Sequence, residues 1–194
     1  MALARGSDAI TCVTVTTYKY LPVLFGAITI NDDALCDTAE AVRIADQWGN
    51  DFTVGFARFT QGLVLINHAG TGSGLGFIVL EEVRESIKQG RLSMTTVPTI
   101  DMYLARAKAR SDDLDGAIEL SRSVVEDLYR SEAMLYRGAA VEVLVELLLR
   151  RGEIDDLREA GVAIDRLAAA PTDPGLVLNE LPLLRLRALL ARPR

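Results

Sequence analysis

The chain has 194 residues, of which 49% are hydrophobic and 25% are charged, and its formal net charge is −6. This composition excludes an intrinsically disordered chain, which would be too polar to bury a core. The acidic balance argues against a broad nucleic-acid surface, because non-specific binding to phosphates depends on clustered Lys and Arg. Ala, Leu, Val, Arg and Glu dominate while aromatic residues make up 6%, so the composition favours an all-α fold.

The two cysteines and the N-terminus indicate the compartment. Cys12 and Cys36 are too few for a disulfide framework and lack zinc-type spacing, so we expect buried thiols in a reducing environment. The N-terminus shows no signal-peptide pattern, and the most apolar run, residues 20–30, is too short to span a bilayer. We therefore expect a cytoplasmic protein with no membrane segment, metal or cofactor.

Apolar residues at helical spacing predict the elements in chain order. The first helix of each pair is expected at roughly 10–28, 51–68, 98–110 and 133–151, and a trailing helix at 177–191. Pro22 lies inside the first of these stretches and should kink it or delay its start. Turn-like clusters separate the helices at 31–33, 70–74, 111–113, 151–153 and 171–175.

The second helices show an internal repeat. Their first apolar residues are separated by 40, 39 and 40 positions: Leu35, Leu75, Leu114 and Ile154. Ten positions later most carry an apolar residue, although Glu85 breaks the pattern. A period of about 40 residues with two helices per unit predicts a tetratricopeptide-like α-solenoid of about four helix hairpins plus the trailing helix. We expect residues 1–194 to form a single repeat domain, a fragment or short relative of a longer array.

The glycine-rich segment 70–76 is the motif most suggestive of a ligand site. It is neither a dinucleotide-binding fingerprint nor a P-loop, and the next lysine is Lys88. We expect an inter-hairpin loop here rather than a phosphate site.

No catalytic constellation is expected either. His68 is the only histidine, and no nucleophile motif accompanies it, so it should interact with carbonyls at a helix end. The acidic pairs at 32–33, 112–113 and 155–156 recur at turns, which favours helix capping over metal binding.

The concave face of a solenoid is lined by its first helices, and proteins of this architecture use that face for partners. Five first-helix residues are therefore the candidate partner contacts: Arg58, Gln61, Tyr103, Arg106 and Arg137.

Several stretches carry a family resemblance: residues 39–45, 49–58, 97–106, 113–118, 162–171 and 183–191. From about Tyr18 onward, the chain resembles the C-terminal tetratricopeptide-like region of mycobacterial and actinobacterial regulators. In that family a class III adenylate or guanylate cyclase-type domain and an ATPase precede the repeats, and some members carry a LuxR-type DNA-binding end. This chain has no match to the cyclase aspartates, the ATPase phosphate loop or the DNA-binding helices, and its 70–76 loop lacks the charge expected there. The family's catalytic residues therefore have no counterpart here.

The sequence thus predicts a non-enzymatic protein-interaction or regulatory segment of a signalling protein. It would bind a protein partner or neighbouring domains of a larger chain, and no nucleic acid. Exposed hairpin faces at both ends would also permit a homo-oligomer. Two alternatives remain open: part of an adenylate/guanylate cyclase or ATPase whose catalytic domains are absent, and a fragment of a LuxR-type transcriptional regulator, against which the charge argues.

Overall fold

A computed structural model describes residues 2–68, 73–90, 97–170 and 177–191. Within these ranges the chain is helical, and its one β-type pairing is an isolated bridge between Ile30 and His68. The predicted all-α class is confirmed. The elements are α1 (Ala2–Tyr20), the 3-10 helix η1 (Leu21–Phe25), α2 (Asp32–Trp48), α3 (Asp51–Asn67), α4 (Ser73–Lys88), α5 (Val97–Arg110), α6 (Leu114–Arg130), α7 (Arg137–Arg151), α8 (Ile154–Ala168) and α9 (Val177–Leu190).

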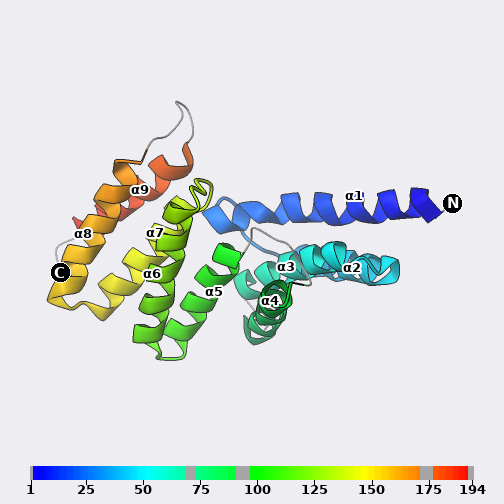
Figure 1. The fold of residues 1–194 in the computed structure, drawn as a ribbon, viewed down its shortest axis with the longest axis horizontal. Coiled ribbons are helices and arrows are strands. Elements are labelled where there is room, and N and C mark those ends of the chain that lie inside the picture. Colours follow the sequence, from blue (N-terminus) through cyan, green and yellow to red (C-terminus); the bar gives the residue numbers. More distant parts are fainter. Residues whose placement is uncertain (1, 69–72, 91–96, 171–176, 192–194) are drawn as a thin grey trace. The chain divides into compact units, whose positions relative to one another are not determined.

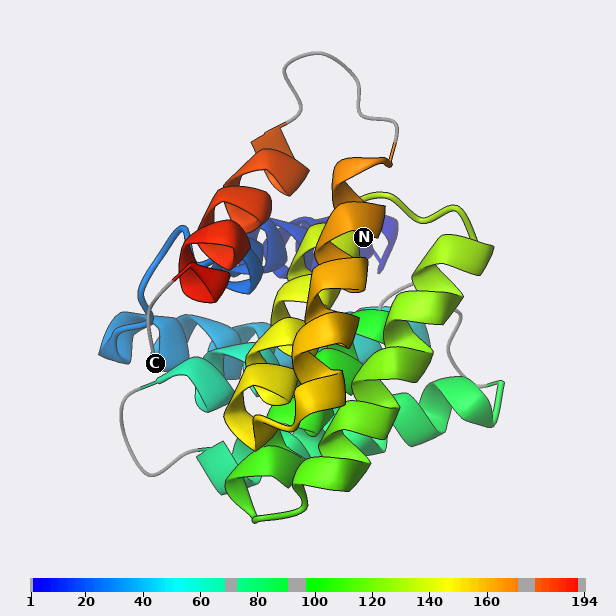
Figure 2. The same cartoon turned by 90° about the vertical axis from the view of Figure 1, so that its left-hand side faces the viewer.

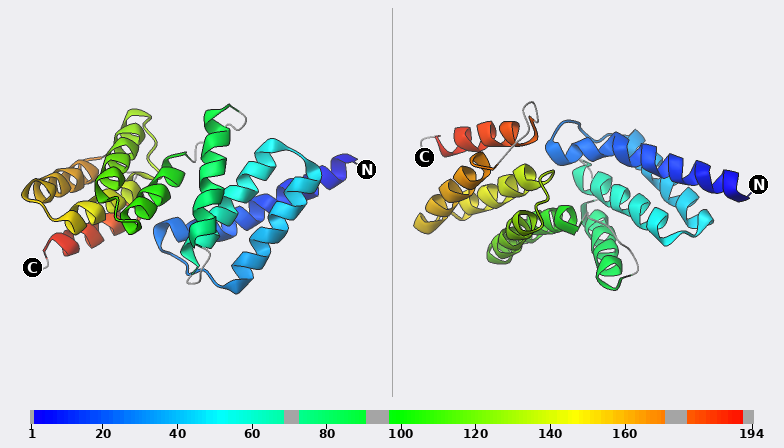
Figure 3. Two further views of the ribbon diagram at one scale, coloured as in Figure 1. Left: turned by 90° about the horizontal axis from the view of Figure 1, so that it is seen from below. Right: turned by 45° about the horizontal axis from the view of Figure 1, so that its top comes forward.

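The helices fall into two compact units, Met1–Val97 with α1 to α4 and Pro98–Arg194 with α5 to α9 (Figure 1). In unit 1, α1 lies along α2 and α3, and α4 packs on α3 (Figure 3). A buried hydrogen bond of 2.7 Å between the hydroxyls of Thr17 and Thr60 joins α1 to α3. In unit 2, α7 packs against α6, α8 and α9, and one apolar core includes residues of all five helices.

The first helix differs most from prediction. It spans Ala2–Tyr20 rather than 10–28, and the chain then tightens into the 3-10 turn η1, with Pro22 at its start. Proline disfavours the α conformation in the residue before it and cannot donate a backbone hydrogen bond, so the helix ends just ahead of it. The other expected first helices and the trailing helix begin or end within a few residues of prediction.

The second helices α2, α4, α6 and α8 begin where the sequence indicated, but two of the proposed apolar anchors are not core residues. Leu75 is 56% exposed and Ile154 is 83% exposed. The residues that are buried in these helices instead lie mostly one or two positions away from the proposed anchors. They recur at helical spacing and include small and polar side chains. Among them are Ala34, Thr38, Ala41 and Ala45 in α2, Gly76, Leu80 and Val83 in α4, Ala117, Ser121, Val124 and Leu128 in α6, and Asp156, Ala160, Ile164 and Leu167 in α8.

Capping explains why these helices begin where they do. The side chain of Asn31 accepts a hydrogen bond from the Ala34 amide at 3.2 Å, and Asp113 accepts from the Gly116 amide at 3.0 Å. At α8 the Glu153 amide donates to the Asp156 carboxylate at 3.0 Å. The capping role predicted for the acidic pairs is confirmed for Asp113 at α6 and for Asp156 at α8, whereas the cap of α2 is Asn31, and Asp32 and Asp33 lie in its first turn.

Replacing Asp113 with alanine should therefore destabilise unit 2 by about 1 kcal/mol, the usual cost of losing an N-cap oxygen. Urea unfolding followed by circular dichroism measures the change. Asp113→Asn should keep most of the stability, because asparagine caps as well as aspartate. An equal loss in both variants would mean that the Lys108–Asp113 ion pair, and not the cap, is responsible.

The glycine-rich segment is only partly the loop that was predicted. Residues 69–72 lie outside the described chain, but Ser73 to Gly76 already belong to α4. Gly62 of α3 and Gly76 of α4 meet where these helices cross. A Cβ atom on Gly76 would lie 2.9 Å from the backbone nitrogen of Ile66, so the two backbones approach more closely than any side chain would allow.

Two further expectations concern the burial of the two cysteines and the presence of membrane-spanning helices. The structure places Cys12 half-buried and Cys36 exposed, so the prediction of two buried thiols is wrong for Cys36, which lies on the outer side of α2. Among the described residues, no helix is long and apolar enough to cross a membrane.

Candidate functional site

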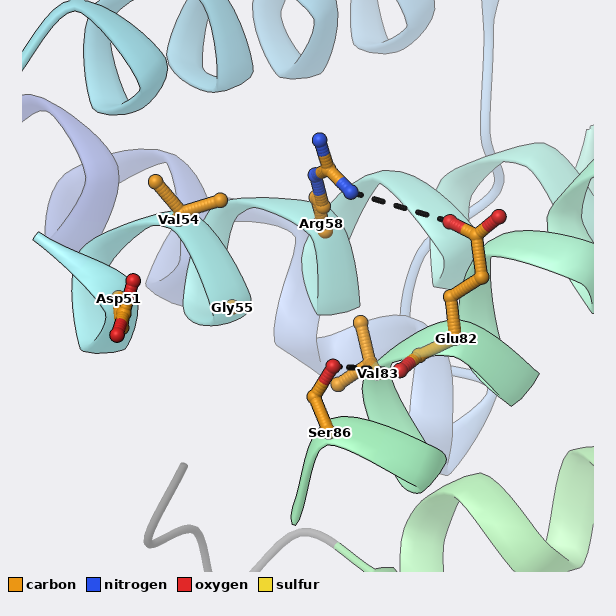
Figure 4. A pocket seen from close by; sticks show the side chains of 7 residues that line it. All are labelled: Asp51, Val54, Gly55, Arg58, Glu82, Val83 and Ser86. Atoms are coloured by element: carbon orange, nitrogen blue, oxygen red, sulfur yellow. Dashed lines mark hydrogen bonds and ion pairs between the residues drawn. The ribbon is translucent and has the colours of Figure 1, made fainter. Parts of the chain in front are cut away.

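A cleft of about 120 Å³ opens between α3 and α4, and one of the predicted contacts lines it (Figure 4). Close contact at Gly62 and Gly76 holds one end of this antiparallel helix pair together, and the cleft lies toward the other end. Its walls are Asp51, Val54, Gly55 and Arg58 of α3 and Glu82, Val83 and Ser86 of α4. The cleft thus lies away from the point where Gly62 and Gly76 bring the two helices together.

Arg58 is the one basic group lining this cleft. Its guanidinium lies 3.8 Å from the Glu82 carboxylate and 3.9 Å from that of Asp46, and its side chain is 43% exposed. Ion pairs this long and this exposed stabilise a fold little. The Arg58 head group can therefore exchange partners at small cost, which suits a surface contact. Gln61, also predicted, lies half-buried one turn further along α3.

In unit 2 the predicted residue Arg106 belongs to a row of charges across α5, α7 and α9. Arg106 of α5 pairs with Glu146 of α7 at 3.1 Å, and Arg185 of α9 lies 3.6 Å from Glu142, one turn earlier on α7. Burial raises the pKa of the Glu142 carboxyl above its ordinary value, and the charge of Glu146 raises it further, although Arg185 and Arg106 oppose the shift. The row is a pattern of alternating charge across the first helices α5 and α7 and the trailing helix α9.

The other two predicted contacts are not on an exposed face. Tyr103 is 3% exposed and Arg137 is 8% exposed, so a partner at the surface would meet little of either side chain. The Arg137 guanidinium donates to the Leu128 carbonyl at 3.3 Å and covers the ring of Tyr129 at 4.7 Å. Its role in the structure is to join α7 to α6.

Sequence reasoning missed a second cleft, of about 220 Å³, between α6 and α8, which run side by side (Figure 2). Two ion pairs of opposite sense cross it: Arg122 of α6 binds Glu159 of α8 at 2.6 Å, and Glu126 of α6 pairs with Arg166 of α8. The Arg166 guanidinium also lies 3.8 Å from the centre of the Tyr129 ring. The signal was available in principle, since these charges recur 37 to 40 residues apart.

The groups considered for catalysis have structural contacts. His68 caps the end of α3, and its Nε2 lies 2.9 Å from a carboxylate oxygen of Asp32. Across the described ranges, no group of three or more His, Cys, Asp or Glu side chains is placed to hold a metal ion.

The fold and these surfaces define an all-helical protein with clefts between neighbouring helices. Compared with known proteins, the sequence matches no family model, no curated protein and no solved structure.

Proposed function

We propose that the chain is a tetratricopeptide-like α-solenoid segment of a cytoplasmic signalling protein and that it binds a protein partner without catalysing a reaction. The repeat is supported by contacts between corresponding helices of successive hairpins. Thr17 and Thr60 are 43 residues apart, Arg106 and Glu146 are 40 apart, and Glu126 and Arg166 are 40 apart. In a solenoid each hairpin is stabilised by such contacts with its neighbours.

The observation that carries the binding role is the charge row on α5, α7 and α9. Arg106 and Arg185 keep 36% and 45% of their side chains exposed, and their guanidiniums lie 3.1 and 3.6 Å from carboxylates of α7. Arginine is enriched among residues that dominate protein–protein binding energy, and a preformed arrangement lowers the entropy lost on binding. A partner with acceptor and donor groups at matching spacing would recognise this row.

Replacing Arg106 with glutamate should weaken partner binding about tenfold or more, the usual effect of removing an arginine anchor. The measurement is capture of proteins from a lysate of the source cells on the immobilised full chain, quantified by mass spectrometry, followed by titration of the captured partner. Tyr103 is left unchanged because its burial would make a variant a test of folding.

Arg130→Glu is the matched control. Arg130 is 75% exposed and pairs with Asp127 of its own helix, outside the row. Equal capture by wild type, Arg106→Glu and Arg130→Glu would refute the assignment of the row as the binding surface.

Each of the two alternative functions can be tested directly. Turnover of ATP or GTP by the purified chain would favour a role in a cyclase or ATPase, and would contradict the non-enzymatic proposal. Binding to duplex DNA at physiological salt would favour the LuxR-type regulator, although a chain of net charge −6 should show none.

A further inference from the structure

Helix α4 carries an exposed stripe that is apolar at one end and acidic at the other. Leu75 and Ile78 are each 56% exposed, and Glu81, Glu82 and Glu85 are exposed further along the helix. At 100° per residue these five residues lie on one side of α4, and the buried Leu80 and Val83 lie on the other. Leu75 and Ile78, one turn apart, form a small exposed apolar patch bordered by charged residues.

Helix α9 repeats the pattern with the opposite charge. Leu181 is 48% exposed and Leu184 is 65% exposed, at the same three-residue spacing as Leu75 and Ile78. Arg185 and Arg187 are exposed on either side of this stripe. Leu186, five positions after Leu181, is buried, just as Leu80 is buried five positions after Leu75. From residue 181 to the last residue the sequence contains arginines and no acidic residue.

We infer that α9 of one copy of the chain docks, in parallel, on α4 of a second copy. A parallel alignment sets Leu181 against Leu75 and Leu184 against Ile78. It also brings Arg185 and Arg187 to the half of α4 that carries the three glutamates. An antiparallel alignment would place leucines against carboxylates, which is unfavourable.

The net charge of the chain favours α9 of a second copy as the segment that binds to α4. Because each copy has a net charge of −6, most surfaces of two copies repel each other, and the arginine-bearing α9 is attracted to the acidic part of α4. The contact joins different surfaces of the two copies, so one such contact leaves an α4 surface and an α9 surface for further association. The mass in solution should therefore increase as concentration rises.

The test is a charge exchange on the full chain, with mass measured by sedimentation velocity over a concentration series. Glu81→Arg combined with Glu85→Arg makes α4 basic and leaves the Arg58–Glu82 pair intact. Arg187→Glu reduces the charge of α9. Each variant alone should associate about tenfold more weakly than wild type. An equimolar mixture should associate again, because it pairs an unchanged α4 with an unchanged α9.

Circular dichroism must first show wild-type helix content in both variants, which is expected because the changed residues are exposed. Leu184→Ser should also weaken association, and added salt should weaken it in the wild type. A wild-type chain that stays monomeric up to roughly millimolar concentration would overturn the inference. So would variants that associate as well as wild type, or a mixture that gains nothing over the separate variants.

Discussion

Replacing Gly76 with valine should destabilise the α3–α4 hairpin by about 3 kcal/mol or more, since overpacking that moves backbone exceeds the usual cost of an enlarged side chain. A Cβ at this position would lie 2.7 Å from the Ile66 side chain, 2.9 Å from the Ile66 amide nitrogen and 3.0 Å from the Gly62 carbonyl oxygen. Two of these three atoms are backbone, which cannot move aside without separating the helices. Trp48 is the only tryptophan and lies in α2 of the same unit, so its fluorescence in a urea series reports the loss.

Gly74→Val is the matched control for this experiment. Gly74 is in the same helix, but a Cβ there would have no atom within 4 Å. The free energy of unfolding should change by less than about 0.5 kcal/mol, as for most surface substitutions. Because valine has a higher helix propensity than glycine, equal losses in the two variants would show that the close approach of α3 and α4 does not set the cost.

The starts of three helices follow from the local sequence, but the buried face of α4 does not. The starts of α2, α6 and α8 were predictable, because Asn31, Asp113 and Glu153 place side-chain or backbone groups at a cap, and this is a local property of the chain. The buried face of α4 was not predictable from hydrophobicity. Its first buried position is a glycine, selected by the backbone of a helix that lies close to it in space.

Some of the predicted partner contacts lie at the surface, and others are buried. Their positions on first helices predict Arg58 and Arg106 as contacts, and the structure places Arg58 between carboxylates of α2 and α4 and Arg106 beside the Glu146 carboxylate of α7. Arg137 was chosen on the same ground and is buried against Tyr129. Which side of a helix faces its neighbour depends on the packing angle, and a repeat with degenerate apolar positions does not determine that angle.

Asp156 is a charged residue that would be expected at the surface from its side chain alone, yet it is buried. Its side chain is 1% exposed, yet it accepts hydrogen bonds from the Arg151 guanidinium at 2.6 and 3.0 Å and from the Glu153 amide at 3.0 Å. Arg151 in turn reaches Asp115 of α6 at 2.6 Å. One arginine therefore joins the end of α7, the start of α8 and the start of α6.

Replacing Asp156 with alanine should accordingly cost about 2 to 3 kcal/mol, because the α8 cap and two charge-assisted hydrogen bonds are lost together. Hydrogen exchange across α8, or urea unfolding by circular dichroism, measures the loss. Asp155→Ala is the control: Asp155 is 77% exposed and pairs only with Arg158 of its own helix. A cost for Asp155→Ala as large as that for Asp156→Ala would assign the effect to negative charge near the helix N-terminus rather than to the buried network.

The pH dependence of the free energy of unfolding tests the contribution of the Arg151–Asp156 ion pair in a second way. Hydrogen bonding to Arg151 holds the pKa of the Asp156 carboxyl below its ordinary value, more than offsetting the rise that burial causes. In the unfolded chain the carboxyl takes up a proton at higher pH than in the folded one. The stability that Asp156 contributes is thus fully present above the unfolded pKa and is lost as pH falls through the folded pKa. The stability difference between wild type and Asp156→Ala should stay constant near neutral pH and shrink below about pH 4. A difference that persisted unchanged into strong acid would mean that the neutral side chain holds α7 and α8 together as well as the ion pair does.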